Sequence, residues 1–316
     1  MILQTQIPLS SQQYHQITYQ SKLVLLGSCF SENIGHKLSY YKFQSSQNPL
    51  GILFQPKAIE NLITHSINKK DYTEKDIFFY NERWHCFDAH SALSCENSED
   101  LLTQLNTSLT ASLEQLTQAT HVIITLGTSW VYRHIETDTI VANCHKVPQK
   151  KFLKELLSVD EISESLEAIN ALLKSINSNV AIIYTVSPVR HLKDGFIENQ
   201  RSKAHLLSAI HAIANTRKAV YYFPSYEIMM DELRDYRFYT EDMIHPNLTA
   251  INYIWEKFIH VWIDNTVHPT MQEVETIQKG LLHRPFNPNS EQHQVFLKNL
   301  ELKIKTLSTA FPFIQF

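Results

Sequence analysis

Continuous apolar runs alternate with amphipathic segments along most of the chain. Uninterrupted runs rich in β-branched residues are typical of parallel strands that are covered on both faces. Apolar residues repeated every three or four positions are typical of helices that pack on one side. The pattern predicts strands at 22–26, 42–46 (the weakest), 121–127, 180–187 and 219–224, and helices at about 31–41, 56–68, 99–117, 160–176, 201–216 and 226–234.

This alternation predicts fold class α/β, with a parallel sheet of about five strands and right-handed crossovers. The segments 70–98 and 131–155 are long, irregular connections. Long ordered loops are usually lids or substrate walls, so we expect both to line a pocket. Helical pattern resumes after Asn247, the predicted N-cap, and the tail predicts two further helices. We therefore divide the chain into a domain at 1–264 and a helical C-terminal extension at 265–316 packed on it.

Composition narrows the class of protein. The 316 residues are 43% apolar and 19% charged, as in ordinary globular proteins. A net charge of −4 without a basic stripe argues against a nucleic-acid partner. The sequence has no run long enough for a membrane helix and no secretory signal, and its four cysteines form no CxxC pair. We expect a cytoplasmic protein with reduced thiols and no membrane partner, and the oligomeric state stays open.

Unusual polar residues follow the predicted strands. Gly27 and Ser28 follow the first strand, and Ser129 comes shortly after the third. Ligands of open parallel sheets bind beyond the carboxyl ends of the strands. A serine there can project above the sheet edge, where the N-terminus of the next helix favours negative charge. Ser28 is therefore a candidate nucleophile, although the usual GxSxG pattern is absent. Cys29 is a rival nucleophile, with buried packing as its alternative role.

A serine nucleophile needs a base and an acid that orients the base. Asp242 and His245 stand three residues apart in "TEDMIHPN", after the last predicted strand. This spacing puts both side chains on one side of a turn. The Asp242 carboxylate can then accept from one imidazole nitrogen and leave the other for the serine hydroxyl. The sequence predicts a Ser28–His245–Asp242 apparatus.

The motif Gly27-Ser28-Cys29-Phe30-Ser31 resembles the one that names the GSCFA family, with Ser in place of the final Ala. The resemblance covers about residues 20 to 260. It includes "NPLGILFQP" (48–56), "TLGTSWVY" (125–132), "VANCHKVP" (141–148), "TVSPVRHLKDGFIENQRSKAHL" (185–206) and "YFPSYEIMMDELRDYRFYTEDMIHPN" (222–247). The family is similar to SGNH, or GDSL-like, hydrolases. The resemblance implies a flavodoxin-like three-layer α/β/α sandwich of the SGNH hydrolase type with Ser–His–Asp chemistry.

The resemblance also implies roles for single residues. It makes Ser28 the nucleophile, with its N–H and that of Gly51 in the oxyanion hole, and it makes Asp242 and His245 the acid and base. The third oxyanion donor of SGNH enzymes is an Asn, and here Ser129 occupies that position. We expect Ser129 to donate, or Asn143 to replace it, or catalysis to be weak. Substrate contacts are predicted for Asn48, Trp130, His145, Arg190 and His191.

Arg190 has two interpretations that the sequence does not separate. An arginine at the end of the fourth strand can clamp a carboxylate, a phosphate or a sugar hydroxyl. Alternatively, Arg190 pairs with an acid such as Glu227 or Asp231 and fixes the loop.

These observations predict a serine hydrolase of SGNH type, an esterase or deacylase that forms an acyl-enzyme on Ser28. Its expected partner is a small-molecule or saccharide ester. Acyl transfer, or a non-catalytic carbohydrate- or acyl-binding module, is the alternative, and the missing Asn favours it. A metal-dependent hydrolase is a third possibility, because "WHCFDAH" (84–90) brings two His and an Asp together. That motif lacks a matching half, so we predict no metal and no cofactor.

Overall fold

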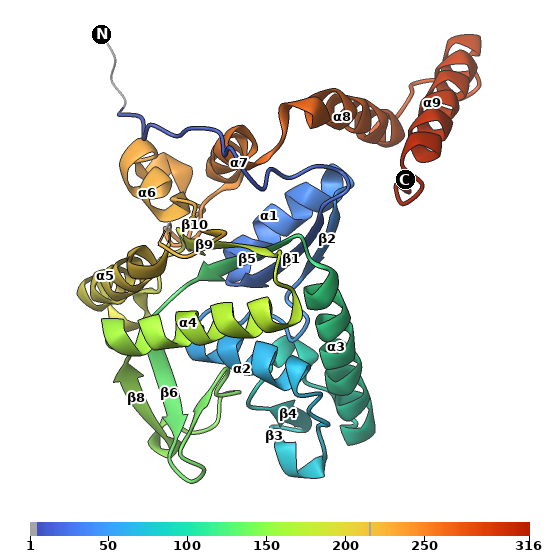
Figure 1. Cartoon of the computed structure of the whole chain (residues 1–316). Helices are drawn as coiled ribbons and strands as arrows, with labels where there is room; N and C mark the ends of the chain where they lie inside the picture. Colours follow the sequence, from blue (N-terminus) through green and yellow to red (C-terminus); the bar gives the residue numbers. More distant parts are fainter. Residues whose placement is uncertain (1–4, 215) are drawn as a thin grey trace.

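A five-stranded parallel sheet forms the centre of the computed structural model, which describes residues 5–214 and 216–316 (Figure 1). Its strand order is β10-β9-β5-β1-β2, with every pair parallel. Numbered among these five, the order is 2-1-3-4-5, which is the flavodoxin-like arrangement. The predicted α/β class is confirmed. The strands are β1 (Lys22–Gly27), β2 (Gln44–Gln47), β5 (His121–Leu126), β9 (Ala181–Val186) and β10 (Val220–Tyr222).

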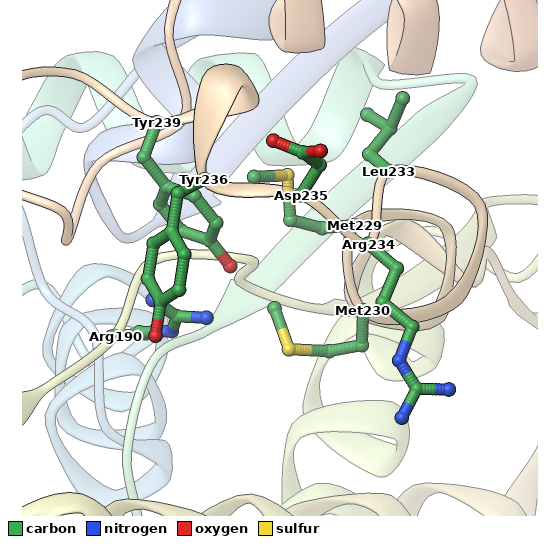
Figure 2. Close-up of a pocket in the computed structure, with 8 residues that line it drawn as sticks. All are labelled: Arg190, Met229, Met230, Leu233, Arg234, Asp235, Tyr236 and Tyr239. Atoms are coloured by element: carbon green, nitrogen blue, oxygen red, sulfur yellow. The ribbon is translucent and has the colours of Figure 1, made fainter.

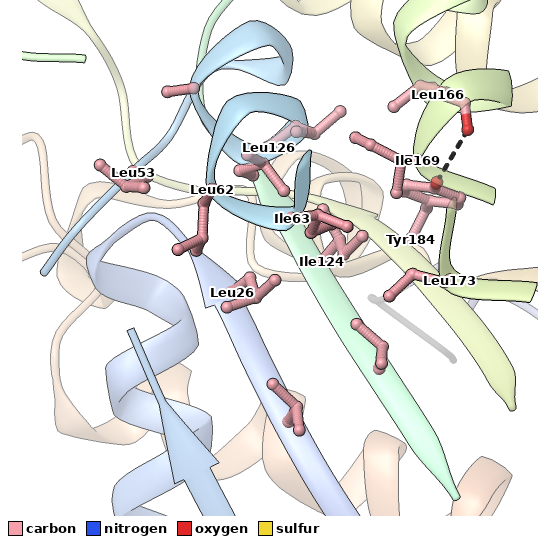
Figure 3. Close-up of a cluster of buried hydrophobic side chains, with 14 of the residues drawn as sticks. Leu26, Leu53, Leu62, Ile63, Ile124, Leu126, Leu166, Ile169, Leu173 and Tyr184 are labelled. Carbon is pink, nitrogen blue, oxygen red and sulfur yellow. Dashed lines mark hydrogen bonds between the residues drawn. The ribbon is translucent and has the colours of Figure 1, made fainter. Parts of the chain in front are cut away.

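Helices cover both faces of this sheet and complete three layers. Side chains alternate along each strand, so Val24 and Leu26 of β1 face one layer while Leu23 and Leu25 face the other. Figure 3 shows Leu26 packed in the first of these cores, where the Tyr184 hydroxyl donates to Leu166 O (3.4 Å). The first layer holds α2 (Pro56–Ile67), α3 (Ser98–Gln118), α4 (Val159–Ile176) and α5 (Phe196–Ile213), and the second holds α1 (Cys29–Tyr40) and α7 (Leu248–Trp262).

Several helices and strands begin or end at other residues than the sequence pattern predicts, for local reasons. Helix α1 begins at Cys29 because the Ser28 hydroxyl caps it by accepting from Phe30 N–H (3.3 Å). Strand β2 begins at Gln44 because Lys42 has a φ of 63°. The predicted helix 226–234 is the short α6 (Ser225–Glu227) followed by the π-helical turn η5 (Ile228–Glu232). Short 3₁₀ turns are η1 (Glu74–Asp76), η2 (Ser91–Leu93), η3 (Gln149–Lys151), η4 (Leu192–Asp194), η6 (Tyr236–Phe238) and η7 (Asn265–Val267).

The two long connections contain strands that the pattern missed. Asn81 and Glu82 both have positive φ, as in a primed hairpin turn, although the usual Asn-Gly signal is absent. They join β3 (Ile77–Tyr80) to β4 (Arg83–Cys86) as an antiparallel pair. The second connection forms an antiparallel sheet in the order β7-β6-β8, from β6 (Trp130–His134), β7 (Thr139–Val141) and β8 (Phe152–Leu156). Both lie at the bottom of Figure 1.

The tail forms the two expected helices, α8 (His268–Leu282) and α9 (Glu291–Ala310). Met271, Val274 and Ile277 of α8 are buried in the core shared with α1 and α7. Lys303 of α9 pairs with Glu273 of α8 (2.8 Å). Within the part of the chain that the structure describes, no helix is both long and apolar enough to cross a bilayer.

Gly27 closes β1 with a φ of 136°, and a Cβ there would lie 2.2 Å from Thr125 O. A positive φ alone costs an ordinary residue about 1–3 kcal/mol. We expect Gly27→Ala to lower the free energy of unfolding by more than this, because the clash adds to the strain. Gly195→Ala is the matched control, since Gly195 has a φ of 90° and open space around it. Equal losses in urea unfolding of the two variants would contradict the clash.

Candidate active site

The candidate site lies where the direction of the chain reverses across the sheet. Strands β1 and β5 are neighbours, but the chain leads from β1 to β2 at one edge and from β5 to β9 toward the other. Ligands of such sheets bind in the crevice at this reversal. Ser28 directly follows β1, and its N–H donates to Thr125 O of β5 (3.0 Å). The sequence therefore folds so that Ser28 stands at the carboxyl end of β1, beside this reversal.

A turn after β2 holds Ser28 in place. Asn48, with a φ of 43°, accepts from Gly27 N–H through Oδ1 (2.9 Å). Its side-chain amide also reaches Glu32 of α1 (3.5 Å). The Asn48 side chain therefore fixes the start of α1, and its contact with substrate stays a prediction. Ser28 itself is 2% exposed, so its hydroxyl lies below the surface of the site.

The rival nucleophile, Cys29, has the wrong electrostatic environment. Burial and the nearby Glu32 carboxylate raise the pKa of the Cys29 thiol. Nucleophilic cysteines act as thiolates and need a lowered pKa. At neutral pH Cys29 stays protonated, which favours Ser28.

Asp242 and His245 form a hydrogen-bonded pair. His245 Nδ1 lies 2.6 Å from Asp242 Oδ2. A carboxylate only accepts, so Nδ1 carries the proton and Nε2 keeps its lone pair. Asp242 Oδ1 accepts from the Thr240 hydroxyl (2.6 Å) and from the N–H groups of Ile244 (2.8 Å) and His245 (3.0 Å). These bonds, led by that of Thr240, hold the pKa of Asp242 well below its usual range.

Ser28 and His245 share no hydrogen bond within residues 5–214 and 216–316, and such bonds often form only in the substrate complex. Electrostatic effects nevertheless connect their surroundings. Burial, followed by the charges of Lys203 and His245, lowers the pKa of His191 to about 3. Lys203 also interacts with Cys29, the neighbour of Ser28. Two hydrogen bonds tie the same segments together: Lys203 Nζ donates to Ser187 O (2.7 Å), and Arg190 N–H donates to Ile244 O (3.3 Å).

Helix α5 places buried polar side chains against the loops at the sheet edge. The sequence pattern did not predict that these side chains hold the loops. Asn199 accepts from His191 N–H (2.8 Å), and Ser202 accepts from Ser129 N–H (2.8 Å). Lys203 is 1% exposed and donates to Ser187 O (2.7 Å). Burial lowers the pKa of Lys203 to about 7. The position of Lys203, three residues before the core residue Leu206, is the signal that could have revealed its burial.

Three predicted oxyanion donors already have acceptors. Ser28 N–H donates to Thr125 O, and Gly51 N–H donates to Asn48 O (2.8 Å). Ser129 is fully buried, and its hydroxyl donates to Ser202 O (3.2 Å). This corrects the expectation that Ser129 donates into the site, and the predicted oxyanion hole is not assembled in this structure. Asn143 uses Oδ1 to accept from His145 N–H (2.8 Å), so its amide N–H stays the predicted donor.

A cavity of about 340 Å³ lies beside the carboxyl end of β5. It brings together three of the predicted substrate residues, Trp130, His145 and His191. The segment 131–155 lines it, as predicted. The segment 70–98 contributes none of the lining residues, which corrects that prediction, because it packs behind the wall. Cys86 O there accepts from His145 Nε2 (2.7 Å). The lining also includes Phe54, Gln55, Thr128, Val131, Tyr132, Val141, Ala142, Asn143, Cys144, Lys146, Val147, Gln149, Lys193 and Asp194.

Arg190 lies in a different cavity, of about 220 Å³. Figure 2 shows its guanidinium beside Tyr236 and Tyr239, and it stands 4.1 Å from the centre of the Tyr239 ring. Its Nη1 donates to Met243 O (3.1 Å). Among the described residues Arg190 pairs with neither Glu227 nor Asp231, which corrects that interpretation, while its contact with substrate stays a prediction. Arg190 positions the loop that carries His245.

The described residues do not offer a metal centre. Across 5–214 and 216–316, no three His, Cys, Asp or Glu side chains cluster as metal ligands do. His85 of the "WHCFDAH" motif instead lies 2.6 Å from the Ser94 hydroxyl and 2.9 Å from Tyr80 O. All four cysteines are free thiols.

Comparison with known proteins places these features in a family. The model of the GSCFA family matches residues 22–258, which include Ser28, the cavity and His245. This chain belongs to the GSCFA family. The model of the GSCFA domain protein, C-terminal domain, matches residues 274–316 of this GSCFA protein. No curated protein sequence matches it.

A solved structure is also similar to the GSCFA protein. It is the crystal structure of a carbohydrate esterase family 3 from Talaromyces cellulolyticus, with 9% sequence identity. The match covers 81% of this chain and 99% of the other, with a TM-score of 0.36. A similarity this low carries no argument about function.

The buried Lys203 should make the stability of the GSCFA protein depend on pH. An unfolded lysine has a pKa of about 10.4, so between pH 7 and 10 the unfolded state binds a proton that the folded state lacks. Raising the pH therefore stabilises the parent, by up to about 1.4 kcal/mol per pH unit. The Lys203→Met variant lacks this gain. We therefore expect its free energy of unfolding in urea, minus that of the parent, to fall as the pH rises from 7 to 10. The exposed Lys298→Met is the control, and a constant difference for Lys203→Met would contradict the shift.

Proposed function

We propose that this protein is a serine hydrolase of SGNH type that cleaves an O-acyl ester, as an esterase or deacylase. The observation that carries the proposal is the Asp242–His245 pair, with 2.6 Å between Nδ1 and Oδ2. Its segment is tied to the chain that follows β9, because Arg190 N–H donates to Ile244 O (3.3 Å). This is the acid and base arrangement that a serine nucleophile requires.

The chemistry proceeds through an acyl-enzyme. His245 Nε2 takes the proton of the Ser28 hydroxyl while Oγ forms a bond to the ester carbonyl carbon. The tetrahedral intermediate collapses, the alcohol oxygen leaves, and the imidazolium returns the proton to it. Water then attacks the acyl-enzyme by the same route and releases the carboxylic acid and Ser28. Asp242 keeps the ring in the required tautomer and stabilises its charged form.

Catalysis also requires a change at Ser28. Its hydroxyl is buried, accepts from Phe30 N–H (3.3 Å) and shares no hydrogen bond with His245 among the described residues, so we propose that it rotates to meet the base. The same rotation releases Phe30 N–H at the N-terminus of α1. A free N–H at the positive end of a helix dipole can stabilise an oxyanion. Phe30 N–H and the Asn143 amide are therefore our proposed donors, in place of the occupied ones.

A second candidate is a non-catalytic module that binds a carbohydrate or acyl group, or an enzyme that transfers the acyl group instead of hydrolysing it. The observation that favours the binding module is that Ser28 N–H, Gly51 N–H and the Ser129 hydroxyl all have acceptors within the protein. Labelling of Ser28 by a fluorophosphonate distinguishes an enzyme from a binding module.

We expect Ser28→Ala to lower hydrolysis of p-nitrophenyl acetate by about 10⁴ or more and to abolish fluorophosphonate labelling. Cys29→Ala is the control, and it should keep both, because the raised pKa of Cys29 leaves the thiol protonated. Melting temperatures check that both variants fold. Activity that survives Ser28→Ala but disappears in Cys29→Ala would assign the nucleophile to Cys29.

Asp242→Asn should keep the fold and lose turnover, by about 10⁴ if Asp242 acts as in a typical triad. The amide can donate to His245 Nδ1, which stabilises the wrong tautomer. Asp235→Asn provides a matched control in the same region, because Asp235 pairs with Arg237 (2.9 Å) and not with His245. Steady-state turnover with circular dichroism measures both variants. Full activity of folded Asp242→Asn would remove Asp242 from the mechanism.

A further inference from the structure

Three polar side chains of the 340 Å³ cavity have atoms without a hydrogen-bond partner among the described residues. They are both amide atoms of Gln55, Nδ1 of His145 and Nε2 of His191. Gln55 is 2% exposed and His145 is 5% exposed. Buried polar groups nearly always have a partner, because an unsatisfied one destabilises the folded state. Three such groups in one wall point to a ligand that supplies the missing partners.

The protonation of His145 indicates what this ligand must offer. Its Nε2 donates to Cys86 O (2.7 Å), because a carbonyl oxygen only accepts. Burial lowers the pKa of His145 to about 4, so the ring is neutral at pH 7 and Nδ1 carries a lone pair. That lone pair needs an O–H or N–H donor, which a carboxylate lacks. The Gln55 amide, with one donor group and one acceptor, adds a site for a hydroxyl.

The remaining walls offer aromatic surface and two cationic side chains, Lys146 and Lys193. Trp130 and Tyr132 present aromatic surface to the cavity, together with Val131 and Val141. Lys154 stands over the Trp130 ring (4.4 Å), but it is paired with Asp194 and its charge is balanced. Aromatic surface packs against the C–H faces of a sugar, while neutral polar groups bind its hydroxyls. About 340 Å³ lies near the lower end of ligand-site volumes, which favours a single ring.

We propose that this cavity binds a monosaccharide unit through its hydroxyl groups, with Gln55 and His145 as its specificity-determining residues. The unpartnered atoms are themselves buried although their residues line the cavity, so binding requires these side chains to rotate. His191 belongs to this wall and interacts electrostatically with His245. The proposal therefore deepens the proposed function, on which it rests for one point, that the sugar is the alcohol part of the ester.

Binding is measured on Ser28→Ala, so that turnover plays no part. The probes are methyl β-D-glucopyranoside, methyl α-D-mannopyranoside, methyl β-D-xylopyranoside and N-acetylglucosamine, with sodium glucuronate as the charged counterpart, followed by ligand-observed NMR. We expect at least one of these sugars to bind, because the unpartnered atoms require hydroxyl partners. Gln55→Leu in the Ser28→Ala background should weaken sugar binding by about tenfold or more.

Two measurements keep the test decisive. Gln55→Leu should melt no lower than the parent, because it removes no hydrogen bond, and Gln292→Leu on the exposed face of α9 is the matched control for the change. The proposal is overturned if no sugar binds, or if folded Gln55→Leu binds as tightly as Ser28→Ala alone. Sugar binding without any esterase activity in the parent would instead refute the proposed function and leave the sugar site standing.

Discussion

The close approach of β1 and β5 at Gly27 is the constraint on which the candidate site depends. A side chain at this position would meet Thr125 O, and the same oxygen accepts from Ser28 N–H. Asn48 holds Gly27 from the other side. Because the chain is fixed on both sides here, α1 begins at one defined residue. The place of the proposed nucleophile is therefore a property of backbone packing between two strands.

Polar side chains of helix α5 hold the loops at the rest of the sheet edge. Asn199, Ser202 and Lys203 are buried, and they bind the chain segments that follow β5 and β9. Loops rarely keep one conformation without such bonds, since their backbone groups need partners. The arrangement has a cost in stability, because a buried amine favours its neutral form. It also explains why the hydroxyl of Ser129 is directed into the protein.

The sequence was sufficient for features that depend on neighbouring residues. Apolar runs located the five central strands, and the three-residue spacing of Asp242 and His245 placed their side chains within 2.6 Å. Features that depend on distant partners were missed. Ser129 meets Ser202 across 73 positions, and His145 meets Cys86 across 59. No local pattern records such pairs, so the occupied donors became visible only in three dimensions.

The family resemblance located the segments around the site better than it predicted the roles of single residues. It identified the blocks that surround the sheet edge, and the family itself is confirmed. It did not indicate that Asn48 and Arg190 bind neighbouring segments of chain, with Asn48 on Gly27 and Arg190 on Met243. A polar residue near a site can serve the loop as well as the ligand, and only its hydrogen bonds distinguish the two roles.

The small antiparallel sheet β7-β6-β8 separates the residues that form the cavity wall from the residues proposed for catalysis. Ser28 and His245 stand on segments anchored to the central sheet, whereas most of the cavity wall comes from the insertion between β5 and α4. Replacements within that insertion can reshape the wall without disturbing the strands that hold the reacting groups. Ligand preference and chemistry can therefore evolve at separate rates in this fold.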